Sequence, residues 1–192
     1  MFRTLRSILI AGLAALALSS AAHAAGGNYV FDGGTPKEQG QVRAALNVSA
    51  FNWSLVPVQI TIHIVPGLAN SEATRGEIWL DPALLDAGVF SWGTVQHEYA
   101  HQVDFFLLDD AKRAMLAPML GGRAWWQTAS ASISHGALTS ERFASTLAWS
   151  YWPSPRNSLK PQSKKDESAA MAPAKFRALM TQTIGAPDAL AA

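Results

Sequence analysis

Residues 95–104, VQHEYAHQVD, contain two of the chain's five histidines, placed four positions apart with a glutamate directly after the first. On an α-helix, residues i and i+4 lie one above the other, about 6 Å apart. The imidazoles of His97 and His101 can therefore bind one tetrahedral zinc ion at Zn–N distances of about 2.0–2.1 Å. Glu98 lies beside this position and can accept a proton from a water on the metal. The segment predicts a helix that carries a zinc site.

A helix face that carries two solvated histidines is the alternative for this segment. The surrounding residues 92–108, WGTVQHEYAHQVDFFLL, are mostly apolar and leave few positions that suit solvent. Burying three ionisable groups is costly unless they share a partner. A bound metal ion is therefore the favoured interpretation.

A catalytic zinc site usually has three protein ligands and one water. The residues after His101 lack the glycine and third histidine of the metzincin pattern. Glu141 is the preferred third ligand, because it begins a later predicted helix and small Ala144 lets that helix approach the histidine helix. The alternative for Glu141 is an acidic residue that simply favours the first turn of a helix. His135 is the rival third ligand.

Strand character is present in three segments: residues 28–32, 58–65 and 76–80. Segment 58–65 alternates apolar and polar residues, which is typical of a half-buried strand, and His63 lies on its polar face. Residues 67–75 are assigned to a polar loop. Helices are predicted after a Thr35 capping box and over residues 82–85, 92–108, 111–116, 141–152 and 173–184. Asp81, Ser91 and either Thr139 or Ser140 are the expected caps of three of them. Together these elements predict an α+β domain in which a short mixed sheet packs against the histidine helix.

The N-terminus has the layout of a secretory signal peptide. Arg3 and Arg6 precede an uncharged apolar run, and Ala22-His23-Ala24 is a small-x-small cleavage pattern. An uncleaved membrane anchor is the alternative, but the run is shorter than the roughly 20 residues that a spanning helix needs. Cleavage after residue 24 leaves 168 of the 192 residues, a single domain over 25–192 in which 153–172 form a mobile loop. We therefore expect a secreted, periplasmic or extracellular protein without stable membrane association.

Composition narrows the classes of partner. Without the signal peptide, 13 of the 15 basic residues remain against 14 acidic ones, so nothing indicates nucleic-acid binding. The chain has no cysteine, so an exported form has no disulfide, and a bound metal would supply part of the missing stability. We expect a monomer that acts on a peptide or protein substrate.

The segments HEYAH (97–101) and SERFASTLA (140–148) resemble the gluzincin clan of zinc metallopeptidases. The second segment is similar to the E-x-F-A pattern of small bacterial members, including catalytic domains of the anthrax-lethal-factor type. The resemblance covers about residues 76–150. It implies a zincin-like fold, zinc (Zn²⁺) on His97, His101 and Glu141, and peptide hydrolysis by a zinc-activated water with Glu98 as general base. It also implies that strand 76–80 is the edge strand that pairs with an extended substrate.

One position departs from that pattern. Thermolysin-like members carry an acidic residue four positions after the ligand glutamate, where it holds a histidine, and here that position is Ser145. Asp104 is a candidate for orienting a histidine instead, with a solvent contact as its alternative. His135 is the candidate that stabilises the developing oxyanion, with Tyr151 in reserve, although either can be purely structural.

Two other classes of function stay open. One is a non-catalytic secreted binding or structural protein whose metal site holds helices together, which a closed fourth coordination position and no cleft beside Glu98 would favour. The other is an enzyme whose zinc site cleaves something other than protein. Trp125 and Trp126, in an apparent loop, are the two tryptophans considered for a substrate subsite.

Overall fold

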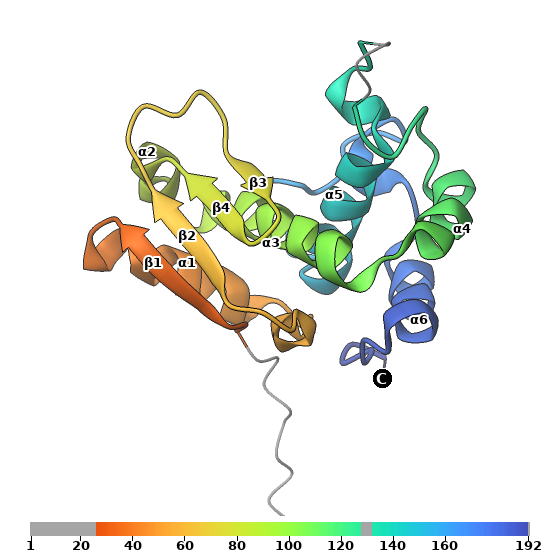
Figure 1. Ribbon diagram of the computed structural model, residues 1–192, viewed down its shortest axis with the longest axis horizontal. Coiled ribbons are helices and arrows are strands. Elements are labelled where there is room, and N and C mark those ends of the chain that lie inside the picture. The colour runs from red at the N-terminus through yellow and green to blue at the C-terminus, as the bar shows by residue number, and fades with distance from the viewer. Residues whose placement is uncertain (1–25, 128–131, 192) are drawn as a thin grey trace, which may run out of the picture.

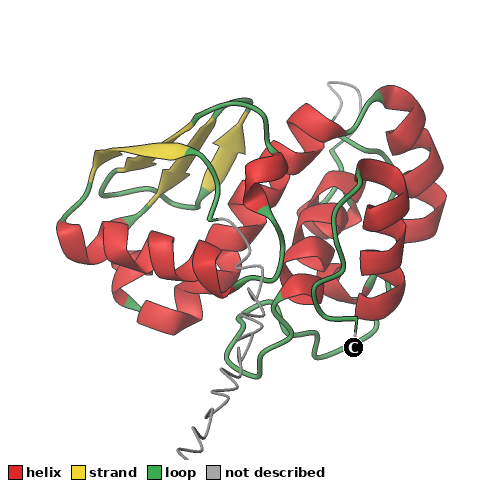
Figure 2. Cartoon of the chain, turned by 90° about the horizontal axis from the view of Figure 1, so that it is seen from below, coloured by secondary structure: helices red, strands yellow, loops and turns green. Residues whose placement is uncertain are grey.

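Helix α3 (Trp92–Leu107) lies between a β-sheet on one side and a group of helices on the other (Figures 1 and 2). The computed structural model describes residues 26–127 and 132–191, so the predicted signal peptide lies outside the described residues. The predicted α+β class is confirmed. In the described part of the chain, no helix has the length and apolar character needed to cross a membrane.

The sheet has the strand order β1-β2-β4-β3. Its bounds are β1 (Tyr29–Gly33), β2 (Ile60–Ile64), β3 (Glu72–Thr74) and β4 (Glu77–Leu80). The first three strands in this order are parallel, and β3 pairs antiparallel with β4. Two predictions are therefore wrong. Residues 67–75 were predicted to be a loop but contain β3, and segment 76–80 was predicted to be an edge strand but forms β4, which lies inside the sheet. The edge strand next to β4 is β3, and β1 is the other edge. Arg75 and Gly76 join β3 to β4, and the φ of +90° at Gly76 suits glycine.

The sheet buries one face and leaves the other polar. Ile60, Ile62 and Ile64 of β2 are buried, whereas Thr61 and His63 between them are only partly buried. Helices α1 (Pro36–Val48) and α3 cover the apolar face (Figure 2). The opposite face carries His63, with Nδ1 2.8 Å from Asp32 Oδ2, so the predicted polar face is confirmed.

Helix caps agree with the sequence at the start of the chain and differ later. Helix α1 begins with the predicted capping box, in which Thr35 Oγ1 accepts from the Glu38 N–H and Glu38 Oε2 accepts from the Thr35 N–H. Helix α2 (Pro82–Asp86) has Asp81 as its cap. Ser91 does not cap α3, because the 3₁₀ turn η2 (Gly88–Ser91) leads directly into it. Leu138 occupies the N-cap position of α5, so the predicted serine or threonine cap is wrong.

The helical half consists of α4 (Asp110–Leu120), α5 (Thr139–Tyr151) and α6 (Pro173–Ile184), with the 3₁₀ turns η3 (His135–Ala137) and η4 (Glu167–Ala169). A further 3₁₀ turn, η1 (Trp53–Leu55), follows α1. Helix α5 packs along α3, and both Ala100 and Ala144 are fully buried. Small side chains at these positions allow the two helix backbones to approach closely, which places the start of α5 over the histidines of α3.

The α5–α6 connection, residues 153–172, returns over the N-terminal end of α3. The Asn157 amide is buried and donates to the carbonyl oxygens of Ala148 and Trp152. A Cβ atom at Gly93 of α3 would lie 2.3 Å from Asn157 Oδ1, so only glycine permits this approach. Near its C-terminal end the connection contains η4, which packs against α5. The mobility predicted for this segment stays a prediction.

Candidate metal centre

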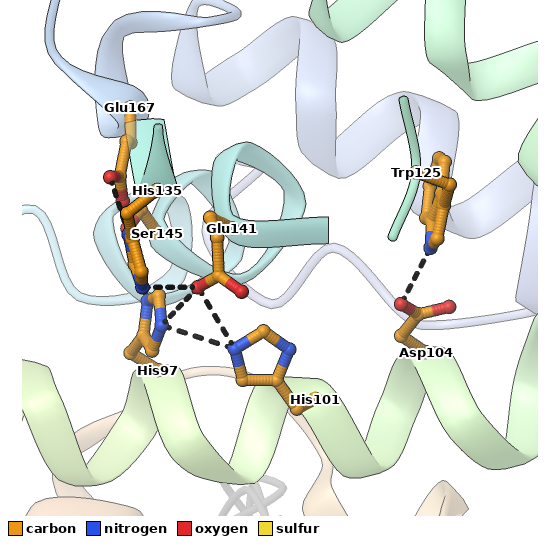
Figure 3. Close-up of polar contacts among 8 residues, drawn as sticks. All are labelled: His97, His101, Asp104, Trp125, His135, Glu141, Ser145 and Glu167. Atoms are coloured by element: carbon orange, nitrogen blue, oxygen red, sulfur yellow. Dashed lines mark hydrogen bonds and ion pairs between the residues drawn. The ribbon is translucent and has the colours of Figure 1, made fainter. Parts of the chain in front are cut away.

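His97 and His101 project from one face of α3 toward the start of α5 (Figure 3). Their Nε2 atoms lie 3.1 Å apart, and both side chains are buried. One turn of helix separates the two residues, so a single small ion can contact both rings. The structure therefore brings the two histidines together as their spacing predicts.

Glu141, in the first turn of α5, completes a triangle with them. Its Oε2 lies 3.2 Å from His97 Nε2 and 3.3 Å from His101 Nε2. In a tetrahedral zinc site with bonds of about 2.0–2.1 Å, neighbouring ligand atoms are about 3.3–3.4 Å apart. The three donor atoms thus fit one face of a zinc tetrahedron. Glu98 is the other carboxylate near both histidines, with the ligand atoms of the three residues all within 4.8 Å of one another.

Glu98 lines the cleft beside the two histidines, but its carboxylate lacks the close imidazole contacts of Glu141 among the described residues. Its side chain is buried, and burial raises the pKa of its carboxyl group, partly offset by His97 and His101. Between described residues, no donor forms a hydrogen bond with its carboxylate. Its lone pairs are therefore available to a molecule in the cleft, as a general base requires.

His135 also reaches Glu141. Its Nε2 lies 3.1 Å from Glu141 Oε2, its Nδ1 lies 3.0 Å from Glu167 Oε1, and its ring is nearly parallel to that of His97. Hydrogen bonds with these two carboxylates raise the pKa of His135 to about 10. Unlike the histidines of α3, its side chain is 68 % exposed. The geometry places His135 at the site and agrees with either predicted role, rival ligand or oxyanion partner.

The carboxylate of Glu141 is strongly favoured in its charged form. Burial alone would raise its pKa, but hydrogen bonds with His101, His135 and His97 hold it far below the usual range of a glutamate. For His97, burial alone would lower the pKa, but Glu141 and nearby carboxylates raise it above the usual value of a histidine. Glu141 is thus an anionic centre for three imidazoles, an arrangement in which a cation can replace protons.

Ser145 and Glu167, which lie outside the segment HEYAH, contact histidines at Nδ1, the ring nitrogen that faces away from Glu141. Ser145 Oγ lies 3.0 Å from His97 Nδ1 and donates a hydrogen bond of 2.9 Å to Glu167 Oε2 (Figure 3). Glu167 also contacts His135 and was missed in the sequence. Its Pro-, Ser- and Lys-rich surroundings have no helical or strand periodicity, so no local signal distinguishes it from a solvated acidic residue.

Two expectations from the sequence are wrong. Asp104 is fully buried, accepts from Arg113 Nε at 2.9 Å and Trp125 Nε1 at 2.8 Å, and has no hydrogen bond to a histidine among the described residues. It joins α3 to α4 and to the chain at Trp125. Tyr151 packs edge-on against Phe51 in the core and does not line the cleft. The reserve oxyanion residue is therefore unavailable to a substrate.

A cleft of about 1020 Å³ opens over the triangle of His97, His101 and Glu141. One wall is the edge strand β3 with its flanking residues, from Asn70 to Arg75. Another wall contains Phe105 and Trp126, whose rings stack 5.3 Å apart. Of the two tryptophans considered for a subsite, Trp126 lines the cleft and Trp125 instead holds Asp104. The site is thus open to a ligand beside Glu98.

Comparison of the chain with models of protein families, with curated proteins and with solved structures finds no match. The likeness to the gluzincin clan therefore depends on the segments HEYAH and SERFASTLA alone. A fold does not determine a function, so function has to be inferred from the residues of the site.

Proposed function

We propose that this protein is a zinc-dependent metallopeptidase of the gluzincin type, with the ion held by His97, His101 and Glu141. The observation that carries the proposal is the triangle of His97 Nε2, His101 Nε2 and Glu141 Oε2, with sides of 3.1–3.3 Å. Two imidazoles and one carboxylate are a donor set of catalytic zinc sites that leave a position open. A zinc ion bound there would supply a water of lowered pKa and polarise the scissile carbonyl.

Glu98 acts as the general base in this proposal. Its carboxylate accepts a proton from the attacking water and later transfers that proton to the leaving nitrogen, so that it ends the cycle as it began. Its burial keeps it out of bulk water, and because it lines the cleft it would be within reach of a carbonyl bound there. His135 donates a hydrogen bond to the developing oxyanion from the exposed side of the site.

The substrate is proposed to bind as an extended segment along β3. This strand is one of the two edges of the sheet and lines the cleft, so its unpaired backbone groups would be available to a peptide bound there. Addition of a strand to such an edge provides main-chain hydrogen bonds without regard to side chains. The stacked rings of Phe105 and Trp126 provide an apolar surface for a side chain next to the cleaved bond. With the signal-like N-terminus, we place this activity on peptides or proteins outside the cytoplasm.

The Glu98→Gln variant tests the mechanism, because it removes the base and keeps its shape. We expect the variant to bind one zinc per chain, measured by elemental analysis, and to lose about 10²–10⁴-fold in the hydrolysis rate of a mixed peptide library. Glu77→Gln, the same change on the outer face of the sheet, is the matched control and should retain full activity. Loss of metal with unchanged hydrolysis in Glu98→Gln would rule the mechanism out.

One observation favours a second candidate, a metal site that only stabilises the protein. His135 Nε2 contacts the same Glu141 oxygen as the other two imidazoles, so it offers a fourth donor that could close the coordination. The open cleft beside Glu98 supports the hydrolase instead. Zinc content together with the peptide-library digest separates the two, since a purely structural site binds zinc and cleaves nothing.

A further inference from the structure

One carboxylate, that of Glu167, lies behind two of the three imidazoles at the site (Figure 3). Its Oε1 is 3.0 Å from His135 Nδ1, and its Oε2 accepts from Ser145 Oγ at 2.9 Å. Ser145 Oγ in turn lies 3.0 Å from His97 Nδ1. Both carboxylate oxygens are thus used, one directly and one through a hydroxyl.

The direction of these hydrogen bonds is fixed at the carboxylate, which only accepts. The Ser145 hydroxyl donates its single hydrogen to Glu167, so its oxygen must accept from His97 Nδ1. His135 Nδ1 must likewise donate to Glu167. A hydrogen on His97 Nδ1 leaves its Nε2 as the position that can bind a metal ion. His135 Nε2 is a donor, because it faces the Glu141 carboxylate, and the contact of Nδ1 with Glu167 turns it toward the cleft.

The backbone holds Glu167 in place for this contact. Thr146 Oγ1 of α5 donates to the Glu167 carbonyl oxygen at 3.2 Å, and η4 packs against α5. Gly136 of η3 has no side chain, and a Cβ atom there would lie 3.2 Å from Glu167 Oε1. The carboxylate therefore lies between α5 and η3, where its contacts with Ser145 and His135 hold it.

We propose that Glu167 is a positioning residue that orients His97 through Ser145 and His135 directly, so that His97 presents Nε2 to the metal and His135 presents Nε2 to the cleft. The inference rests on the proposed zinc site and adds a residue that neither zinc motif contains. It also accounts for Ser145 at the place where related enzymes carry an acidic residue: the hydroxyl passes the contact to a carboxylate from the α5–α6 connection. A carboxylate behind an imidazole fixes its orientation and increases its basicity as a ligand.

Zinc affinity measured by competition with a chromophoric chelator tests this role without reference to activity. Glu167→Gln keeps the shape but replaces one acceptor oxygen by a donor, and we expect zinc binding to weaken about 10–100-fold. Ser145→Ala interrupts only the His97 arm and should weaken binding by about tenfold. Asp166→Asn is the matched control, because among the described residues this neighbouring carboxylate forms hydrogen bonds with Gln162 and Ser163 only. It should bind zinc like the wild type.

A second measurement, hydrogen–deuterium exchange in the metal-free protein, keeps the test independent of the proposed function. Loss of the Glu167 contact should speed amide exchange over residues 135–137 in Glu167→Gln but not in Asp166→Asn. Wild-type zinc affinity in a folded Glu167→Gln variant would overturn the inference. If the wild type binds no zinc, the proposed function fails, and equal exchange in both variants would then overturn the positioning role as well.

Discussion

Glu141 Oε2 is the atom on which the centre converges, because three imidazole nitrogens lie 3.1–3.3 Å from it. Two of those nitrogens come from one buried helix face and are held as a pair by helix geometry. The third belongs to His135, which stands on a short turn and is largely exposed. This difference in burial favours different roles under the proposed function, in which His97 and His101 would hold the ion and His135 would contact a substrate in the cleft.

Replacement of His135 by alanine separates these roles. We expect kcat to fall by about 10²–10³-fold, as for the loss of one oxyanion donor, with zinc affinity unchanged. Peptide hydrolysis and chelator competition on the same preparation provide both values. His63→Ala, a histidine on the outer face of the sheet, is the control and should alter neither. A loss of zinc as large as that caused by His97→Ala would instead make His135 a ligand and favour the structural metal site.

At the scale of elements, Gln102 of α3 fixes the edge of the sheet beside the histidines. Its Nε2 donates to the carbonyl oxygens of Thr74 at 2.8 Å and Glu77 at 3.1 Å, and its Oε1 accepts from the Gly76 N–H at 2.8 Å. The side chain thus clamps both ends of the β3–β4 turn. Because Gln102 directly follows His101, this one side chain sets the distance between the triangle of His97, His101 and Glu141 and the edge strand β3.

The Gln102→Ala variant should therefore affect substrate binding more than chemistry. Three backbone contacts lose their partner, which should lower the free energy of unfolding by about 1–3 kcal/mol. We expect KM for an extended peptide to rise while kcat changes little, measured by steady-state kinetics. Gln39→Ala is the control, since Gln39 also donates to backbone carbonyls but at the far end of the sheet. An unchanged KM with reduced stability would show that β3 does not bind the substrate.

The same elements show what the sequence can and cannot predict. His97, His101 and Glu141 follow from rules of helix geometry and metal coordination that are local to two short segments. Strand β3 was missed because three residues, EAT, are too few to show a period, and the strand forms only by pairing with β4. Glu167 was missed because its role depends on where the α5–α6 connection meets α5. That meeting is a tertiary contact with no pattern in the local sequence.

At the scale of the molecule, the site joins the sheet half to the helical half. Two of its donors come from α3 and one from α5, while His135 and Glu167 add contacts from the segments before and after α5. The chain has no cysteine, so no disulfide crosslinks these parts. A metal ion held between α3 and α5 would act as the crosslink, because it binds the folded arrangement and not the unfolded chain.

Removal of the ion by a chelator should therefore lower the melting temperature. Saturation at about 100 times Kd stabilises the folded state by about 2.7 kcal/mol, which for a domain of this size corresponds to a Tm change of about 5–11 °C. Differential scanning calorimetry with excess zinc and with excess chelator measures the difference. His97→Ala is the control: without one of its ligands the site no longer binds tightly, so its Tm should be the same in both solutions. A wild-type Tm that does not depend on zinc would show that no ion joins α3 to α5.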